Sequence, residues 1–251
     1  MELMLDLKPS TQPTSLFSAR TAQRIDWQRV NPTWRGIQKA EEWARPKVLE
    51  AVKEFRLAAR FQLVKSLYRN PDKGKKDLDR AARTGILVRH DLVTEKGNVP
   101  LLTLGPLGAR LIGDRFVPNW WVDIPLAEVL KRLVVVQLVL RLREAGECHL
   151  FNARSPLSAI VVFNNLDYGV LVVRQDVEEV MENLLFLQAR RLLMVTEDLE
   201  QAGILAGELG DRGRFATDLE LMRSPLVFYR WDGGFVTDKV FKLPGAGRVK
   251  F

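Results

Sequence analysis

The chain has 251 residues, of which 47% are hydrophobic and 27% charged, a balance that excludes collagen-like and low-complexity proteins. At roughly 100–200 residues per domain, this length allows one large domain or two small ones. The longest apolar run, Leu133 to Leu140, is broken by Gln137 and is far shorter than the ~18 residues of a membrane span. Glu2 and Asp6 argue against a secretory signal, so we expect a cytoplasmic protein without a membrane partner.

The composition gives little support for a metal site or a catalytic nucleophile. Cys148 is the one cysteine in the sequence, and His90 and His149 are the two histidines, so the spacing of a zinc site is missing. The segment Gly105-Pro106-Leu107-Gly108 lacks the lysine of a phosphate-binding loop. We therefore expect no metal, no cofactor and no catalytic residues.

Positive charge is concentrated in the first half of the chain. Residues 1–120 hold 22 Lys and Arg against 13 Asp and Glu, whereas residues 121–251 hold 16 against 18. Neutralising phosphates is the main source of sequence-independent affinity for nucleic acids. The first half is therefore a candidate nucleic-acid-binding module, and the alternative is a basic surface with no ligand.

Residues 1–45 combine three prolines and three tryptophans with a mostly polar background. This pattern predicts an extended arm, with a short helix over 37–43, that packs on the body of the protein or docks on a partner.

Three short helices and a hairpin follow this arm. The apolar spacing predicts helices over 46–57, 60–68 and 75–84 and strands over 86–93 and 99–104. The breakers of 70–74 predict a turn before the third helix. Gly85 is the expected C-terminal cap of that helix, and residues 94–98 are the expected hairpin tip.

The segment from Ala82 to Arg89, the hairpin and the segment from Leu102 to Leu111 together resemble winged helix-turn-helix DNA-binding domains. The resemblance implies such a domain over 46–113, with the third helix in the major groove of DNA and the hairpin as a wing on its backbone or minor groove. The alternative is a winged helix that docks on another protein.

Polar and charged residues on or just before the third helix and on the hairpin are the candidate contacts to double-stranded DNA. They are Lys73, Lys75, Lys76, Asp79, Arg80, Arg83, Arg89, Lys96 and Asn98. Spacing alone does not assign them to bases or phosphates.

A linker over 114–124, which contains Trp120 and Trp121, is expected to separate this domain from an α/β domain over 125–251. The predicted elements of the second half are helices over 126–145, 176–186 and 197–209 and strands over 148–153, 159–163, 169–174, 192–195 and 226–231.

The αβββαβα order behind a winged helix resembles the replication-relaxation family of plasmid replication and conjugation proteins, whose second domain is of the PD-(D/E)xK restriction-endonuclease-like type. The resemblance implies an α+β protein with a mixed sheet in its second half. The predicted second and third strands lack the metal-binding carboxylates of such nucleases, so we expect a catalytically dead domain for dimerisation or partner binding.

The sequence thus predicts a non-enzymatic protein that recognises a double-stranded DNA site, such as a plasmid origin, and recruits a relaxase or replication protein. A homodimer would extend the short footprint of one winged helix. The alternatives are a transcriptional regulator with the same DNA-binding half and a divergent metal-dependent nuclease that uses Asp167 or Asp176.

Overall fold

The computed structural model describes residues 15–31, 45–184, 187 and 189–238. It contains α-helices and two β-sheets, so the predicted α+β class is confirmed. The helix expected over 37–43 lies outside the described residues. No helix in the described ranges is long and apolar enough to cross a membrane.

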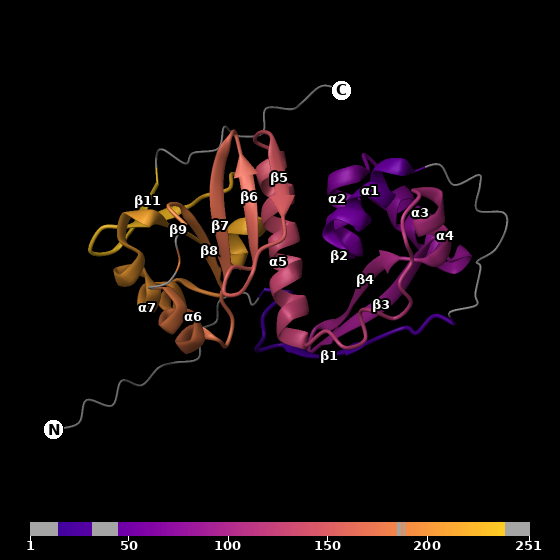
Figure 1. Cartoon of the computed structure of the whole chain (residues 1–251), viewed down its shortest axis with the longest axis horizontal. Helices are drawn as coiled ribbons and strands as arrows, with labels where there is room; N and C mark the ends of the chain where they lie inside the picture. Colours follow the sequence, from indigo (N-terminus) through magenta and orange to yellow (C-terminus); the bar gives the residue numbers. More distant parts are fainter. Residues whose placement is uncertain (1–14, 32–44, 185–186, 188, 239–251) are drawn as a thin grey trace.

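The first sheet has four strands in the order β1-β3-β4-β2, with helices packed against it (Figure 1). The elements are β1 (Ala22–Asp26), α1 (Pro46–Phe55), β2 (Leu57–Ala59), α2 (Arg60–Leu67), α3 (Pro71–Thr84), β3 (Leu87–Thr94), β4 (Gly97–Leu104) and α4 (Pro106–Leu111). β3 and β4 form a hairpin that is in register from Thr94 opposite Gly97 to Leu87 opposite Leu104. β1 pairs antiparallel with the outer edge of β3, so a strand from the predicted arm enlarges the sheet.

The third predicted helix is longer than the sequence indicated. It begins at Pro71 rather than at Lys75, because Asn70 is its N-terminal cap and accepts 3.0 Å hydrogen bonds from the backbone N–H groups of Asp72 and Lys73. Proline fits a first helical turn, where its missing N–H is not needed. Gly74 is a buried position inside the helix, and a Cβ there would stand 2.8 Å from Cγ of Tyr68, so the close contact with Tyr68 favours glycine. The breakers that predicted a turn are therefore a cap and a first turn.

Two glycines allow α4 to pack against the end of α3. Gly85 caps α3 in the left-handed conformation, with φ of 82°, as the sequence predicted. A Cβ on Gly105 would lie 2.3 Å from the carbonyl oxygen of Gly85, and one on Gly108 would lie 2.1 Å from that of Ile86. Both obstacles are backbone atoms, so a side chain has no rotamer by which it could avoid them.

We expect Gly108→Ala to lower the free energy of unfolding by about 1–3 kcal/mol, the usual cost of overpacking a core. Gly207→Ala is the matched control, because Gly207 is exposed in a helix and a Cβ added there would meet nothing within 4 Å. That change should be neutral or stabilising. Urea unfolding of both variants measures the difference, and equal stability would contradict the close packing.

The second sheet has seven strands in sequential order from β11 at one edge to β5 at the other. Its elements, with the helices that connect them, are α5 (Leu126–Arg143), β5 (Cys148–Phe151), β6 (Ala159–Phe163), β7 (Leu166–Val172), α6 (Val177–Leu184), β8 (Leu192–Thr196), α7 (Leu199–Leu209), β9 (Gly213–Thr217), α8 (Asp218–Met222), β10 (Tyr229–Trp231) and β11 (Phe235–Thr237). β7, β8 and β9 are parallel to one another, and the outer strands are antiparallel to their neighbours.

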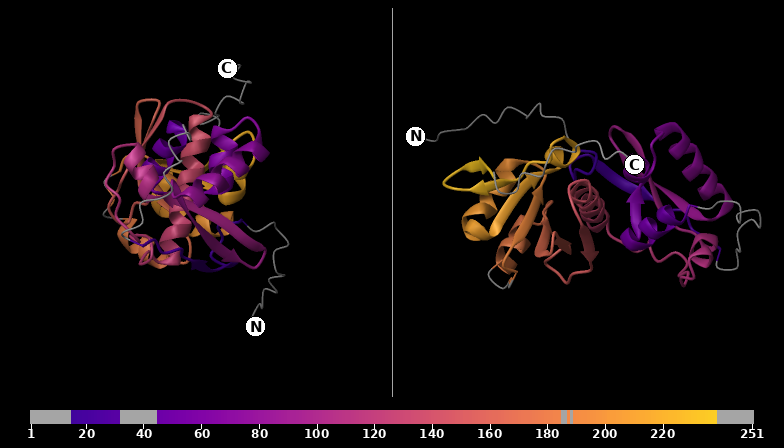
Figure 2. Two further views of the ribbon diagram at one scale, coloured as in Figure 1. Left: turned by 90° about the vertical axis from the view of Figure 1, so that its right-hand side faces the viewer. Right: turned by 90° about the horizontal axis from the view of Figure 1, so that it is seen from above.

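Helices cover both faces of this sheet (Figures 1 and 2). Leu171 and Val173 of the β7 segment pack with α6 and α7, whereas Val170 and Val172 belong to the core on the opposite face, where α5 lies. α5 also contacts β2 and α2, and the side-chain amide of Gln62 donates a 2.8 Å hydrogen bond to the carbonyl oxygen of Leu133. One hydrophobic core therefore runs from the first sheet through α5 to the second.

Several boundaries in the second half differ from the sequence prediction. The turn between β6 and β7 consists of Asn164 and Asn165, both with positive φ, and β7 already begins at Leu166. The strand expected over 226–231 starts at Tyr229. The sequence analysis did not predict β9, α8 or β11. β9 was missed because a glycine, an arginine and a threonine interrupt its apolar residues.

Candidate nucleic-acid interface

α3 presents one face to the core and the opposite face to solvent. Gly74, Leu78 and Ala81 are its buried positions, and they lie within ~60° of one another around the helix axis at 3.6 residues per turn. The helix packs against α2 and β3. Its orientation, and hence the surface it exposes, is fixed by these contacts.

Four cationic side chains form a stripe along the exposed face of α3. They are Lys73, Lys76, Arg80 and Arg83, which we call the α3 stripe, and all four are exposed. Their spacing of three, four and three residues places them within ~80° of one another over a length of about 15 Å. Within the described part of the chain, no side chain forms an ion pair or hydrogen bond with the ammonium or guanidinium group of any of these four residues.

Two acidic residues of α3, Asp77 and Asp79, are paired with arginines from outside the helix. Oδ2 of Asp77 lies 3.3 Å from Nη2 of Arg45, and Oδ1 of Asp79 lies 2.6 Å from Nη1 of Arg60. These two carboxylates flank the α3 stripe, so their pairing leaves its positive charge uncompensated. Asp79, predicted as a DNA contact, thus connects α3 to α2.

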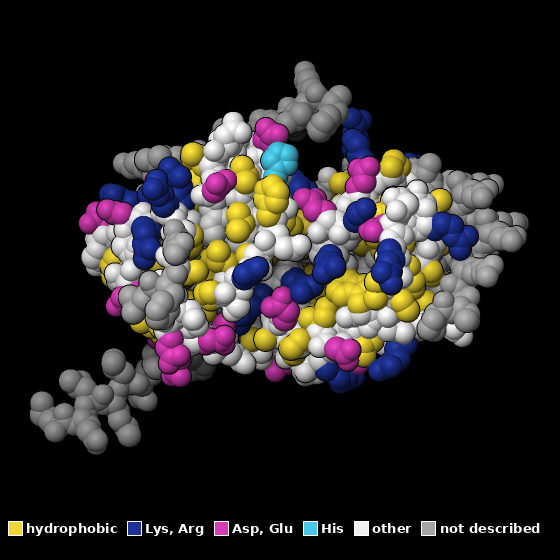
Figure 3. All heavy atoms as spheres, viewed as in Figure 1, with side chains coloured by type: hydrophobic (Ala, Val, Ile, Leu, Met, Phe, Trp, Pro, Cys, Tyr) yellow, Lys and Arg dark blue, Asp and Glu magenta, His cyan; other side chains and the backbone are white. Residues whose placement is uncertain are grey.

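Lys75 differs from the other predicted lysines of α3. Its Nζ lies 3.3 Å from Oδ1 of Asp72, and its position on the helix is away from the α3 stripe. Figure 3 shows Lys and Arg side chains interspersed with Asp and Glu on one face of the molecule. Local pairing rather than net charge therefore decides which cations are free to meet a ligand.

The hairpin carries the three remaining predicted residues. Arg89 is on β3 and forms a 3.0 Å ion pair with Asp91. Lys96 is exposed in the two-residue tip that follows Thr94, and Asn98 is exposed near the start of β4. The structure therefore brings the α3 stripe and the hairpin into one half of the molecule but places Arg89, Lys96 and Asn98 on a different element from the stripe.

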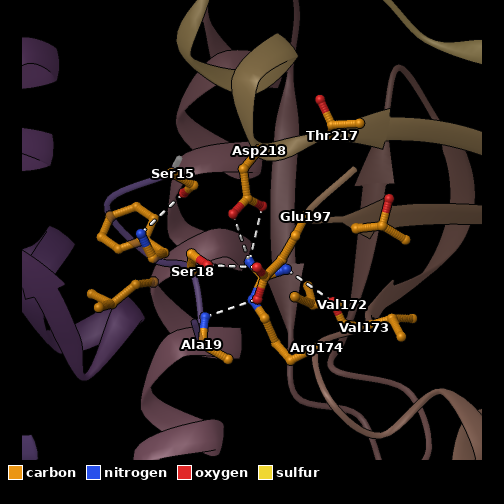
Figure 4. Close-up of polar contacts among 12 residues, drawn as sticks. Ser15, Ser18, Ala19, Val172, Val173, Arg174, Glu197, Thr217 and Asp218 are labelled. Atoms are coloured by element: carbon orange, nitrogen blue, oxygen red, sulfur yellow. Dashed lines mark hydrogen bonds and ion pairs between the residues drawn. The ribbon is translucent and has the colours of Figure 1, made fainter. Parts of the chain in front are cut away.

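A second polar cluster, which the sequence did not predict, lies where the parallel strands end (Figure 4). Arg174 follows β7, Glu197 follows β8 and Asp218 follows β9. Nη2 of Arg174 lies 2.9 and 3.2 Å from the two carboxylate oxygens of Asp218, and both side chains are almost completely buried. Burial raises the pKa of Asp218, and the Arg174 guanidinium opposes that rise. The signal in the sequence was a charged residue within two positions of the end of each parallel strand.

Residues 15–20 cover this cluster. The Ser18 hydroxyl donates a 2.5 Å hydrogen bond to Glu197, whose other carboxylate oxygen accepts a 2.8 Å bond from the backbone N–H of Ala19. Arg20 forms a 3.0 Å ion pair with Asp198. Because β1 begins two residues later and pairs with β3, one segment spans from the second sheet to the hairpin. The cluster thus anchors the arm to the α/β half.

The two aspartates considered for a nuclease lie far apart. Asp167 is exposed near the start of β7, and Asp176 follows the end of the same strand. Asp176 accepts hydrogen bonds from Lys131 and from the backbone N–H of Arg174. Among the described residues, no group of three or more His, Cys, Asp or Glu side chains is placed to hold a metal ion.

Comparison of the chain with protein-family models, curated proteins and solved structures finds no match.

Proposed function

We propose that the protein binds double-stranded DNA through the α3 stripe, with the β3–β4 hairpin as a wing. The single observation that carries this proposal is the stripe itself: four exposed cations in one row, none of them paired within the described residues, on a helix whose Asp77 and Asp79 are paired elsewhere. A helix of this kind fits the major groove, which is about 12 Å wide. The order α1-β2-α2-α3-β3-β4 supports a winged helix-turn-helix.

The α/β half supplies the protein contacts in this proposal. The order α5-β5-β6-β7-α6-β8 supports a restriction-endonuclease-like scaffold, used for dimerisation or for recruiting a replication protein or relaxase. Selection of bound fragments from the source replicon distinguishes the two DNA roles: an origin supports an accessory factor in replication or transfer, and a promoter supports a transcriptional regulator.

The test is a titration of a fluorescent duplex of mixed sequence at about 50 and about 200 mM salt. Four phosphate contacts give a slope of about −3.6 in log affinity against log salt, and hence a loss of about 100-fold over this range. The variant Lys73→Ala/Lys76→Ala/Arg80→Ala should bind at least about tenfold more weakly and lose about three units of that slope.

A charge-matched control separates the stripe from net charge. Lys47→Ala/Arg154→Ala/Arg190→Ala also removes three positive charges, from exposed positions outside α3 and the hairpin. It should retain most of the affinity and slope of the wild type. Equal losses in both triple variants, or no binding by the wild type, would overturn the proposal and favour a winged helix that docks on protein.

A further inference from the structure

A groove of about 610 Å³ lies beside the α3 stripe. Its walls come from the C-terminal half of α3, from β3 and from the segment that follows β1. The lining residues used in the argument are Arg29, Asp79, Arg83, Arg89 and Asp91. Arg83 belongs both to the groove and to the α3 stripe, so the two surfaces are continuous.

The segment on either side of Arg29 is held in place by hydrogen bonds to its neighbours. The backbone N–H of Gln28 donates to Nδ1 of His90 at 3.1 Å, and its carbonyl accepts a 3.0 Å bond from the indole of Trp121. The backbone N–H and carbonyl of Val30 bond to the side-chain amide of Asn119 at 2.7 and 3.0 Å. The exposed Arg29 side chain therefore projects from a fixed backbone at the edge of the groove.

Pairing inside the groove leaves two of its cations uncompensated. Asp79 is paired with Arg60, and Asp91 is paired with Arg89. Within the described residues, no side chain forms an ion pair or hydrogen bond with the guanidinium of Arg29 or of Arg83. Two arginines, one from α3 and one from the segment after β1, thus line a groove whose two carboxylates are already ion-paired.

From this arrangement we propose that the groove seats the sugar-phosphate backbone of DNA that lies on the α3 stripe, with Arg29 as a phosphate contact. The inference rests on the proposed function and adds to it a segment from outside the helices and hairpin. Guanidinium groups suit phosphate because they donate paired hydrogen bonds in a planar fork. A fixed backbone also lowers the entropy lost when Arg29 binds.

The experiment repeats the salt titration with the full-length chain and single substitutions. Arg29→Ala should weaken binding by about 3- to 10-fold and reduce the salt slope by about one, as expected for the loss of one phosphate contact. Arg29→Lys should retain the slope, because the charge remains. Arg24→Ala is the matched control: Arg24 is exposed on β1 and ion-paired with Asp26, outside the groove, and its loss should change affinity by less than about twofold.

Thermal unfolding of each variant shows whether a loss of binding reflects a loss of folding. Arg29→Ala could bind with the affinity and salt slope of the wild type while the triple stripe variant loses binding. That result would overturn the groove proposal and leave the proposed function standing. Weaker binding with an unchanged slope would also overturn it, since a lost phosphate contact must alter the slope. If the wild type binds no duplex, the proposed function fails, and the groove proposal with it.

Discussion

Asp218→Ala should lower the free energy of unfolding by about 3–5 kcal/mol, the usual cost of removing one partner of a buried ion pair. The side chains of Arg174 and Asp218 are 1% and 2% exposed, so the guanidinium left behind cannot reach water without rearrangement. Nη1 of Arg174 also bonds to the carbonyl of Val173, which holds the charge in place. The substitution therefore leaves an uncompensated charge at the end of the central strands.

Urea unfolding monitored by tryptophan fluorescence measures this loss. Asp232→Ala is the matched control, because Asp232 forms a 3.3 Å ion pair with Arg230 in which the side chains are 66% and 46% exposed. Exposed pairs contribute at most about 1 kcal/mol. The double variant Arg174→Met/Asp218→Leu should recover much of the stability, since an apolar pair carries no desolvation cost. Similar losses in Asp218→Ala and Asp232→Ala would show that the buried pair does not stabilise the sheet.

The elements that the sequence predicted are those whose apolar pattern is complete within one short segment of the chain. The apolar positions of α1 and α5 recur at helical spacing, and the alternation in β3 and β4 with a short tip predicts a hairpin. β1 escaped prediction because its sequence, AQRID, has no apolar face. Its stability comes from pairing with β3, more than 60 residues later in the chain, which local pattern does not contain.

The candidate site divides in the same way. Helical spacing places Lys76, Arg80 and Arg83 on one face, so this part of the site could be predicted from the sequence. Lys73 joins them only because the helix begins at Pro71 and not after the predicted turn. The pairing of Asp79 with Arg60 could not, because it depends on how α2 packs against α3. Long-range contacts therefore decide which charges remain available, even where the sequence predicts which ones are exposed.

His90 should make the protein less stable in acid. Its ring is buried between Trp27 and Trp121, with centroid distances of 5.0 and 4.9 Å, and Nε2 lies 3.0 Å from Oγ1 of Thr103. Nδ1 accepts a hydrogen bond from the backbone N–H of Gln28, so protonation of Nδ1 would break that hydrogen bond. Burial lowers the pKa of His90 from 6.5 to about 3. The folded state therefore favours the neutral ring.

The sign of the effect follows from proton binding. Below pH 6.5 the unfolded chain binds a proton at this position that the folded chain excludes until the pH falls to about 3. The stability contributed by the neutral ring is thus complete above pH 6.5 and is lost progressively as the pH falls through that window. Between about pH 7 and pH 5 the loss amounts to about 2 kcal/mol.

Urea unfolding at about pH 7 and pH 5 tests this contribution in His90→Gln. That variant keeps a hydrogen-bonding side chain but cannot titrate, so its stability should fall by about 2 kcal/mol less than that of the wild type over the same pH step. His149→Gln is the matched control, because His149 is exposed on β5 and its ring is bonded to Glu147. It should keep the pH dependence of the wild type. If His90→Gln and the wild type show the same pH dependence, the His90 ring of the wild type accepts a proton in the folded state. The hydrogen bond from the Gln28 backbone N–H would then not keep the ring neutral.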